Sequence, residues 1–549
     1  MNIAAIATAP GTGGIAVIRL SGPDAFTITD RIFRARNRNK TVSTAEAYTM
    51  LFGNIVDEIT DNRVQSTDTQ THSSFLIPHS SFLIDEVIIS VFRAPHSFTG
   101  ENTVEISCHG SVYIQQEILR LLIAAGARMA GPGEFTQRAF LNGRLDLSQA
   151  EAVADLINAQ SAAAHTIALN QMRGNFSSKL EELRRQLLHF VSLLELELDF
   201  GDHDDLEFAD RTELNAVAEA IRSQLSRLQQ TFSQGNAIKN GIPVAIVGET
   251  NAGKSTLLNL LVGDNRAIVS DIHGTTRDVI EDTVNINGLT FRFIDTAGIR
   301  QTSDIIENMG IERTYEMIER AQIILWVVDS TNVTEHIEWL AERIMRRTED
   351  KRLIILLNKV DRLNDEELTT LRQWFEPYTN PNLIANVGTR HAVSEKSVKS
   401  DERLLAQQES ESKNKEISSV NSVSSVREKN NSVGEKNNSV RNTSPQILEI
   451  SAKQSINTEQ LTRLLYESAQ MPDLSAGDII ISNLRHYEAL THALESIDRV
   501  IDGLQMNIPA DFVAQDIREA LFHLAEITGG EITTDEVLGY IFAHICIGK

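Results

Sequence analysis

The chain has 549 residues, of which 41% are hydrophobic, so its length and composition suit about three domains with packed cores. Its formal net charge of −24 argues against a general nucleic-acid binder, because non-specific binding depends on Lys and Arg side chains that neutralise phosphates. Any action on a nucleic acid would need a local basic patch or a basic partner.

The sequence predicts a cytoplasmic protein with no membrane anchor. Two cysteines in the whole chain cannot form a disulfide framework, which indicates a reducing compartment. The first residues, MNIAAIATAPGTGG, lack the basic and long apolar regions of a signal peptide. The longest apolar runs, such as IILWVV, are far shorter than the roughly 20 residues that cross a bilayer, so they indicate buried strands.

Four segments with different patterns follow one another along the chain. Residues 1–143 have short alternating apolar runs broken by Gly and Pro, which is typical of an α+β domain. Residues 144–240 and 471–549 carry apolar residues at helical spacing. Between them, residues 241–470 alternate β-rich runs with helical stretches, which predicts a mostly parallel sheet with crossover helices.

Each of the two helical segments has one apolar face to bury. The simplest solution is that they pack on each other as one discontinuous helical domain, with the α/β domain inserted between its halves. Two separate bundles are the alternative. The predicted fold class is therefore a multidomain α/β protein: an N-terminal α+β domain, a discontinuous helical domain and an inserted domain with a mostly parallel sheet.

Two stretches resemble insertions, and we assign neither a catalytic role. Residues 392–445 hold 13 Ser and 7 Asn, no aromatic residue, and the hexapeptide EKNNSV twice. Such a segment cannot bury enough apolar surface to fold, so we expect it to be disordered. Residues 72–85, HSSFLIPHSSFLID, repeat a seven-residue unit and resemble a small tandem duplication in a loop.

A phosphate-binding loop opens the inserted domain. GETNAGKS, at Gly248–Ser255, matches G-x-x-x-x-G-K-[ST] and stands between a β run and a helical run, as the motif requires. Its glycines let backbone N–H groups surround phosphate oxygens at a helix N-terminus. Lys254 would reach the β- and γ-phosphates, and the Ser255 hydroxyl would bind Mg²⁺. The motif alone leaves ATP and GTP open.

Three further motifs indicate that the nucleotide is GTP and not ATP. DTAG follows a strand, so that Asp295 could hold Mg²⁺ and the Gly298 N–H could meet the γ-phosphate. NKVD follows another strand, and Asp361 offers two acceptors for the N1–H and amino group of guanine, a donor pair that adenine lacks. ISAK brings the Ser451–Ala452 backbone near the guanine carbonyl. Four motifs in this order predict a P-loop GTPase domain.

The motifs supply most of the candidate GTP-binding residues. These are Asn251, Ala252, Gly253, Lys254, Ser255, Thr256, Asp295, Thr296, Ala297, Gly298, Asn358, Lys359, Asp361, Ser451, Ala452 and Lys453. Regulatory GTPases position the attacking water with a Gln, but Ile299 follows DTAG in this chain. Either hydrolysis is very slow or another group takes that role.

At this point the chain resembles a known family. GETNAGKS, IVSDIHGTTRD, DTAGIR, IENMGIERT and the terminal CIGK together look like the bacterial tRNA-modification GTPases called MnmE or TrmE. So does PGEFTQRAFLNGRLDLSQAEAVADLI at 132–157. The resemblance covers nearly the whole chain apart from the two insertions.

The resemblance implies potassium-activated hydrolysis of GTP. Two G domains would meet, and K⁺ would take the place of an arginine finger, where a fixed cation stabilises developing negative charge. Glu307 would orient the water, with Lys254 and Asn251 as the other catalytic candidates. The implied potassium ligands are Asn251, Ser270, Ile272 and Thr275, the magnesium ligands are Ser255 and Thr276, and the added GTP contacts are Ser270, Asp271, Ile272, Thr275 and Thr276. Without the resemblance, Asn251 indicates a loop-capping amide and Glu307 a solvated helix carboxylate.

The resemblance also implies a folate site in the N-terminal domain. The family binds 5-formyltetrahydrofolate or a related tetrahydrofolate there, and the matching residues are Arg19, Glu105, Arg144 and Lys549. A carboxylate such as Glu105 can accept from the donor edge of the pterin, and cations suit the glutamate tail. Family members often have Lys where Arg144 stands, which keeps the charge but changes the geometry. Ordinary surface ion pairs and a strand-edge carboxylate are the alternatives.

The implied reaction modifies the wobble uridine of certain tRNAs with a 5-carboxymethylaminomethyl or aminomethyl group. The chain would form a homodimer through residues 1–143 and a heterotetramer with a flavin-dependent subunit, the glucose-inhibited division protein A. FAD and NADH would come only through that partner, since the chain has no convincing G-x-G-x-x-G. A GTP-dependent ribosome assembly factor that binds rRNA, and a self-contained folate methyl-transfer enzyme, are the competing hypotheses.

The last residues, CIGK, have the length of a prenylation signal but not its chemistry, because Gly548 is not aliphatic and Lys549 is not a usual final residue. Cys546 has no second cysteine in C-x-x-C reach. By resemblance, the tail meets the folate site, with Lys549 as a contact and Cys546 near the modification chemistry. A buried structural thiol is the alternative for Cys546.

Overall fold

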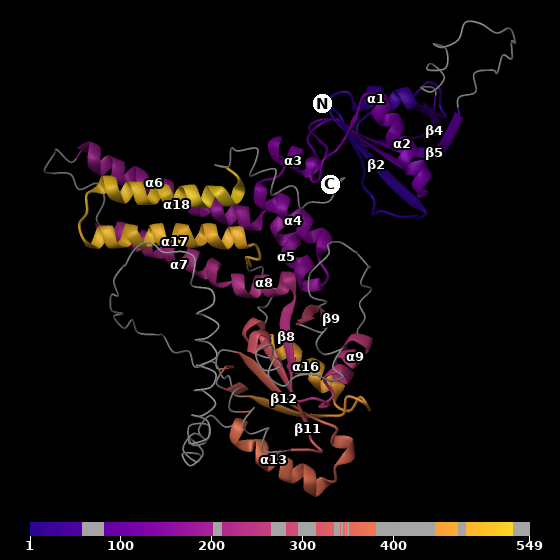
Figure 1. The fold of residues 1–549 in the computed structure, drawn as a ribbon. Helices are drawn as coiled ribbons and strands as arrows, with labels where there is room; N and C mark the ends of the chain where they lie inside the picture. The colour runs from indigo at the N-terminus through magenta and orange to yellow at the C-terminus, as the bar shows by residue number, and fades with distance from the viewer. Residues whose placement is uncertain are drawn as a thin grey trace, which may run out of the picture. The chain divides into compact units, whose positions relative to one another are not determined.

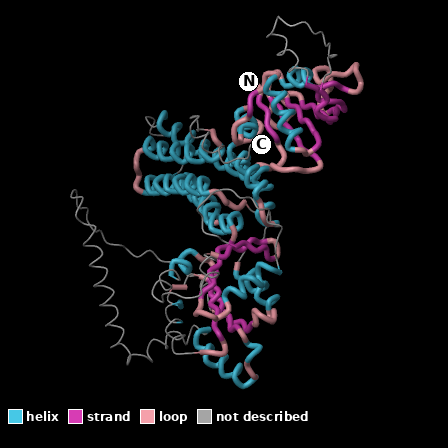
Figure 2. The backbone as a smooth tube through the Cα atoms, turned by 45° about the vertical axis from the view of Figure 1, so that its right-hand side comes forward, coloured by secondary structure: helices cyan, strands magenta, loops and turns pink. Residues whose placement is uncertain are grey.

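The computed structural model describes most of the chain. The described residues are 1–57, 82–200, 211–264, 282–294, 315–333, 341, 344–345, 347–348, 351–379, 445–469 and 479–530. The chain divides into two compact units, one comprising residues 1–239 and 473–549 and the other residues 240–472. Figures 1 and 2 show the helices and strands of both units. The second unit is therefore an insertion in the first.

The N-terminal part of the first unit is a seven-stranded sheet with two helices against one face. The strand order is β3-β4-β5-β6-β2-β1-β7, and only β1 and β7 pair in parallel. The strands are β1 (Ile3–Ile6), β2 (Ile15–Ser21), β3 (Phe33–Ala35), β4 (Thr49–Asp57), β5 (Phe82–Phe92), β6 (Thr103–His109) and β7 (Arg128–Met129). The two helices are α1 (Ala25–Ile32) and α2 (Val112–Ala124), which share a hydrophobic core with the sheet, and α3 (Glu134–Leu141) follows β7.

Successive side chains of a strand point to opposite faces of a sheet, so the strands also show which residues lie on the face away from α1 and α2. The side chains of β6 on either side of Glu105 are buried in the core, so Glu105 lies on the opposite face. The strand register places Arg19 of β2 and Ser90 of β5 opposite Glu105. Farther along the same face, Phe52 of β4 is paired with Ile88 of β5, and both are exposed. This face therefore carries a charged pair and exposed apolar side chains.

Two segments far apart in the sequence form one helical domain. The first contributes α4 (Leu147–Asn158), α5 (Ala162–Met172), α6 (Asn175–Phe200), α7 (Arg211–Gln230) and α8 (Phe232–Asn240), and the second contributes α17 (Leu484–Gln505) and α18 (Ala510–Thr528). Helix α6 lies beside α18, and α7 lies beside α17 (Figure 1). Their buried side chains, such as Leu187, Ile221, Ile497 and Ile517, belong to one core. The predicted discontinuous helical domain is confirmed, and the alternative of two separate bundles is wrong.

The inserted unit is built on a six-stranded sheet of order β13-β12-β11-β8-β10-β9, in which only β9 runs antiparallel. The strands are β8 (Ile242–Val247), β9 (Asp282–Ile286), β10 (Leu289–Phe293), β11 (Ile323–Asp329), β12 (Arg352–Asn358) and β13 (Gln446–Ile450). The described helices are α9 (Lys254–Asp264), α13 (Asp365–Thr379), α16 (Thr458–Ser468) and the short η2 (Val360–Arg362). Trp326 of β11 and Phe375 of α13 meet edge to face in a buried core. The expected mostly parallel sheet is confirmed.

The structure corrects one expectation about the repeated segment 72–85. The last four residues of the second copy, from Phe82 to Asp85, are not a loop, because they begin strand β5. Asp85 is buried and accepts from the backbone N–H of His109 at 2.8 Å, and the His109 ring lies 2.7 Å from its other oxygen. The described end of the second copy therefore belongs to the sheet.

Some expectations fall on residues outside the described ranges. The prediction of a loop for the first copy of the repeat falls on residues 72–78, which lie outside these ranges. The prediction of disorder for the Ser- and Asn-rich segment falls on residues 392–445, of which only the last is described. In the described part of the chain, no helix combines the length and apolar character needed to cross a membrane.

The segment that returns from the inserted unit passes very close to α8. A β-carbon placed on Gly235 of α8 would lie 2.1 Å from the carbonyl oxygen of Ile481. The Ile481 N–H donates to the Thr231 hydroxyl at 3.0 Å. Only a residue without a side chain allows this approach.

We therefore expect Gly235→Ala to destabilise the first unit. This is the reverse of the usual effect, because alanine inside a helix normally stabilises it by ~1 kcal/mol relative to glycine. The new methyl group must displace a backbone carbonyl, and a net loss of about 1–3 kcal/mol should follow in chemical denaturation monitored by circular dichroism. The matched control is Gly263→Ala in α9, where a β-carbon meets nothing within 4 Å, and which should be neutral or slightly stabilising. An unfolding midpoint for Gly235→Ala at or above that of the wild type would contradict the close approach.

Candidate nucleotide and folate sites

The phosphate-binding loop lies between the end of β8 and the start of α9. Gly248 and Gly253 have φ angles of +145° and +101°, and a β-carbon on Gly248 would lie 2.1 Å from the Val327 carbonyl oxygen. Asn251, at φ +63°, stands exposed on the loop. The loop therefore leads into the first turn of α9, where a helix has backbone N–H groups of the kind that bind phosphate.

Lys254 is held by the loop itself. Its Nζ donates to the carbonyl oxygens of Gly248 and Glu249 at 2.7 and 2.6 Å. Burial lowers the pKa of Lys254 below its usual value. An anion in the loop would supply the counter-charge that a partly buried ammonium group favours. Ser255, in the first turn of α9, is exposed, and its hydroxyl is the hard oxygen ligand that suits Mg²⁺.

Asn358, at the end of β12, joins the phosphate loop to the base-binding motifs. Its Nδ2 donates to the carbonyl of Ala252 at 2.7 Å, and its Oδ1 accepts from the N–H of Ala452 at 3.0 Å. Asn358 is 3% exposed, and a β-carbon on Gly253 would lie 2.2 Å from its Nδ2. One buried amide therefore fixes the spacing between the loop of GETNAGKS and the loop of ISAK.

The guanine-reading residues lie at the same edge of the sheet. Asp361 is exposed in η2 and accepts from the Gln454 side chain at 3.3 Å. Lys359, at φ +70°, pairs with Asp329, the last residue of β11. Burial would raise the pKa of Asp329, but Lys359 and Thr331 outweigh it and hold this pKa below its usual value. The edge therefore has an open carboxylate at Asp361 and a lysine fixed beside it.

The motifs did not predict two of these neighbours. Asp329 ends the apolar run IILWVVD, so its position at the carboxyl end of a parallel strand was a usable signal. Gln454 directly follows ISAK, and nothing in its residue type singled it out. Ser451 and Ala452 are buried, and Lys453 and Thr256 are exposed.

Several candidates lie outside the described residues. They are Ser270, Asp271, Ile272, Thr275, Thr276, Asp295, Thr296, Ala297, Gly298, Glu307, Cys546 and Lys549. Their predicted roles remain predictions.

The structure brings two folate candidates into direct contact. Arg19 donates from Nε and Nη2 to Oε1 of Glu105 at 2.9 and 2.7 Å. The guanidinium lies 5.5 Å from the ring centre of Phe98 and 5.6 Å from that of Phe135. Neither charged side chain is fully buried, with 14% of Arg19 and 27% of Glu105 exposed. A partly exposed cation and carboxylate therefore lie beside the half-buried Phe98 ring, whereas Phe135 is fully buried in the core, and a charged ligand could reach the exposed part of the pair.

Arg144 is placed by the loop that carries Phe98. Its side chain is exposed, and it would lie 3.2 Å from a β-carbon on Gly100. The neighbouring Asn142 donates from Nδ2 to the Thr99 carbonyl at 2.7 Å. The β5–β6 loop therefore lies next to Arg19 at Phe98 and next to Arg144 at Gly100.

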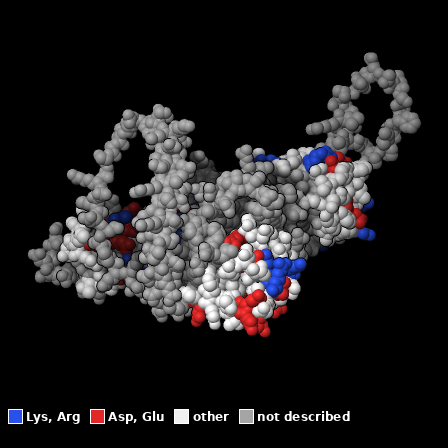
Figure 3. Space-filling model, turned by 60° about the horizontal axis from the view of Figure 1, so that its bottom comes forward, with Lys and Arg blue, Asp and Glu red and all other residues white. Residues whose placement is uncertain are grey.

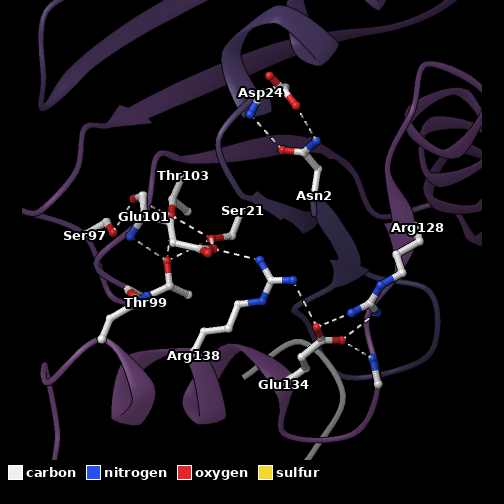
Figure 4. A network of polar contacts seen from close by, with 12 residues as sticks. Asn2, Ser21, Asp24, Ser97, Thr99, Glu101, Thr103, Arg128, Glu134 and Arg138 are labelled. Atoms are coloured by element: carbon white, nitrogen blue, oxygen red, sulfur yellow. Dashed lines mark hydrogen bonds and ion pairs between the residues drawn. The ribbon is translucent and has the colours of Figure 1, made fainter.

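A polar network holds this loop against α3 (Figure 4). Arg138 donates to Glu101 at 2.8 Å and to Glu134 at 3.1 Å. Glu101 also accepts from the Ser21 hydroxyl at 2.8 Å, and Ser21 shares a hydrogen bond with Thr99. Sequence reasoning missed these residues, although Glu134 and Arg138 stand within the quoted motif PGEFTQRAFLNGRL.

The phosphate loop, the Asn358 bridge and the exposed Asp361 at one edge of a mostly parallel sheet define a P-loop GTPase. Comparison with known proteins gives the family. A model described as the MnmE helical domain matches residues 147–546, and one described as the GTP-binding protein TrmE N-terminus matches residues 2–144. The chain belongs to the MnmE (TrmE) family of GTPases.

Full-length relatives agree with the family models. A protein of Parabacteroides distasonis named tRNA modification GTPase MnmE is 50% identical over the whole of both chains. One of the same name from Bacteroides fragilis (strain YCH46) is 48% identical over all of this chain and 99% of its own. A crystal structure of Era with MgGDPNP and a segment of 16S ribosomal RNA aligns with 46% of this chain and 65% of its own, at 23% identity and a TM-score of 0.23.

We expect Asn358→Ala to weaken nucleotide binding. The change leaves the Ala252 carbonyl and the Ala452 N–H without their buried partner, and each unmet group costs ~1–3 kcal/mol. The affinity for both GTP and GDP should fall at least about tenfold in titration calorimetry, which corresponds to 1.4 kcal/mol.

The matched control is Asn364→Ala, because the Asn364 Oδ1 also accepts from two backbone N–H groups but at an exposed helix start. It should leave the affinity within about twofold, a change of ~0.4 kcal/mol. Equal affinities for both variants would show that the Asn358 bridge does not organise the site.

Proposed function

We propose that this GTPase modifies the wobble uridine of certain tRNAs with a 5-carboxymethylaminomethyl or aminomethyl group, using a folate one-carbon unit and a flavin-dependent partner. The observation that carries the proposal is the end-to-end identity of 50% to a protein named tRNA modification GTPase MnmE. A partly exposed Arg19–Glu105 pair beside the half-buried Phe98 ring in the N-terminal domain supports the folate step. The competing ribosome assembly factor has no comparable full-length support.

For GTP hydrolysis, we assign the phosphates to Lys254 and the loop N–H groups, and guanine to Asp361. Asn251, Thr275 and the carbonyls of Ser270 and Ile272 would hold K⁺, and Ser255 and Thr276 would hold Mg²⁺. Asn251 supports this assignment, because it is exposed on the loop at φ +63° and offers an amide oxygen. Bound cations would supply positive charge opposite the charge that develops on the phosphates. Glu307 would orient the attacking water.

We expect cells that lack the gene to lose the modified wobble uridine, as measured by mass spectrometry of digested tRNA. Wild-type chain should restore it, and Glu307→Ala should not, because the variant binds GTP but loses most turnover. Replacing K⁺ with Na⁺ at equal ionic strength should slow hydrolysis by the wild type.

The matched control is Glu319→Ala, which removes an exposed carboxylate of the same unit. It should turn over GTP and restore the modification. Normal wobble uridines in the deletion strain would overturn the tRNA proposal, and near-normal turnover by Glu307→Ala would overturn only the role of that residue.

For the folate, we assign three residues within the described ranges as contacts: Arg19, Glu105 and Arg144. The Arg19–Glu105 pair places an acceptor where a pterin donor edge could bind, and Arg144 adds a cation next to the same loop. Lys549 would add a contact, and Cys546 would lie near the modification chemistry. Both of these roles rest on the family alone.

We expect Arg19→Met to weaken binding of 5-formyltetrahydrofolate about tenfold or more, a change of 1.4 kcal/mol, because Glu105 loses its charged partner. Titration calorimetry checks the affinity, and GTP binding should not change. The matched control is Arg31→Met, which removes an exposed arginine that donates to the Ala125 carbonyl elsewhere in the domain. If both variants bind the folate like the wild type, the site lies elsewhere.

The proposed assembly is a homodimer through the N-terminal domain and a heterotetramer with the flavin-dependent subunit, in the cytoplasm. The exposed Met50, Phe52 and Ile88 on one sheet face support association, because soluble monomers rarely expose contiguous apolar surface. The net charge of −24 supports a division of labour in which the partner supplies much of the tRNA affinity, together with FAD and NADH. On the face drawn in Figure 3, basic side chains form small groups beside acidic ones.

A further inference from the structure

The inserted unit is attached to the rest of the chain at two crossings. The chain enters it after Lys239 and returns at Asp473. The described residues next to these crossings are α8 and the segment 479–483 that leads into α17. Any change in the nucleotide-binding unit that travels along the chain must pass through one of these two segments.

The two crossing segments are fastened to each other. The Ile481 N–H donates to the Thr231 hydroxyl, and Gly235 lies directly against the Ile481 carbonyl. At the start of α8, the ring of Phe232 stacks on the ring of Tyr487 in α17, with centres 4.5 Å apart. A displacement of one segment therefore moves the other.

Both segments are also held by one helix, α4. Asp155 accepts from Lys239, the last residue before the inserted unit, at 2.7 Å. Four residues earlier, on the same face of α4, Glu151 accepts from Asn483 at 3.0 Å and from Nε of Arg485 at 2.9 Å. The entry and the return of the inserted unit are thus tied to two carboxylates of a single helix.

Arg485 extends this tie to the end of α18. Its Nη1 donates to the carbonyl of Glu526 at 2.6 Å and its Nη2 to that of Ile527 at 3.0 Å. These carbonyls belong to the last turn of α18, where a helix has acceptors that lack partners of its own. The same guanidinium therefore contacts Glu151 and the point from which the C-terminal segment continues.

Burial makes this cluster stiff. His486 is 1% exposed and lies 2.8 Å from Glu151, with the Phe176 ring packed against its own ring. Burial alone would raise the pKa of Glu151, but His486 and Arg485 hold it down to about 2, so Glu151 is charged at neutral pH. A buried charge that loses its partner is strongly unfavourable, so separating Glu151 from Arg485 is costly.

We propose that Glu151, acting through Arg485, is a positioning residue that couples the nucleotide state of the inserted unit to the last turn of α18. The inference rests on GTP binding by the inserted unit and on no part of the folate or tRNA proposals. An ion cluster with a purely structural role would hold α4, α17 and α18 together without responding to nucleotide.

The test is hydrogen exchange of the full-length chain, measured without nucleotide, with GDP and with a non-hydrolysable GTP analogue. Two regions are compared: the amides of α9, which report nucleotide binding, and those of residues 524–530, which report the end of α18. For the wild type, we expect protection of α9 by either nucleotide and at least a fivefold difference in exchange between the two nucleotides at 524–530.

Glu151→Gln keeps the size and most hydrogen bonds of the side chain but removes its charge. It should retain the protection of α9 and lose the difference at 524–530. Arg485→Lys keeps the charge but cannot reach Glu151 and two carbonyls at once, so it should show the same loss even if Glu151→Gln folds poorly. The matched control is Asp516→Asn, which breaks the Arg499–Asp516 pair between α17 and α18 away from the crossings, and which should behave like the wild type.

Three results would overturn the inference. The first is a wild type whose residues 524–530 do not distinguish the nucleotides. The second is a folded Glu151→Gln or Arg485→Lys variant that keeps the wild-type difference. The third is a control that loses it. If α9 of the wild type showed no protection, GTP binding itself would be contradicted, and the coupling with it.

Discussion

The shared core of the helical domain is the constraint on which the rest of the structure depends. Helices α6 and α7 present apolar faces that α17 and α18 cover, although more than two hundred residues separate the two pairs in the sequence. Neither pair can remove its apolar surface from water alone, and burial of such surface contributes about 25 cal/mol per Å². The chain must therefore leave this domain and return to it, and α8 and residue Ile481 of the first unit lie against each other.

The nucleotide site also depends on a buried contact between segments that are far apart in the sequence. Three loops that follow β8, β12 and β13 must reach one edge of the sheet with a fixed spacing. Parallel pairing of β8, β11, β12 and β13 brings the strand ends together, and Asn358 then sets the distance between two of the loops. A single buried amide can do this because each of its polar atoms has one backbone partner, so moving either loop leaves a buried group unmet.

Local patterns were sufficient for the fold class and for the described nucleotide motifs. Helical spacing predicted the two halves of the helical domain, and the strand-then-motif order predicted where Lys254, Asn358 and Asp361 stand. These signals are local, because each motif carries its own flanking strand or helix. Arg19 and Glu105, by contrast, were named as folate contacts only through the family, and the structure alone shows that they pair, since the pair depends on a strand register between residues 86 positions apart.

Contacts that depend on packing were not predictable in the same way. Arg138 and Glu101 meet because α3 lies against the β5–β6 loop, and no spacing in the sequence encodes that approach. Glu151 and Arg485 are separated by 334 positions, and each alone is an ordinary charged residue on a helix. The repeated segment was predicted wrongly for a related reason: a repeat suggests an insertion in a loop, but the last four residues of its second copy begin a strand.

That strand start has a consequence for the choice of register in the N-terminal sheet. Both copies of the repeat offer the apolar triplet FLI, so the ladder could in principle be completed by either one. The triplet is followed by Pro78 in the first copy and by Asp85 in the second. Proline has no N–H for a ladder and no carboxylate for the His109 N–H and ring, whereas Asp85 meets both. One residue therefore makes two nearly identical segments unequal, and it protects the sheet from slipping by a whole repeat.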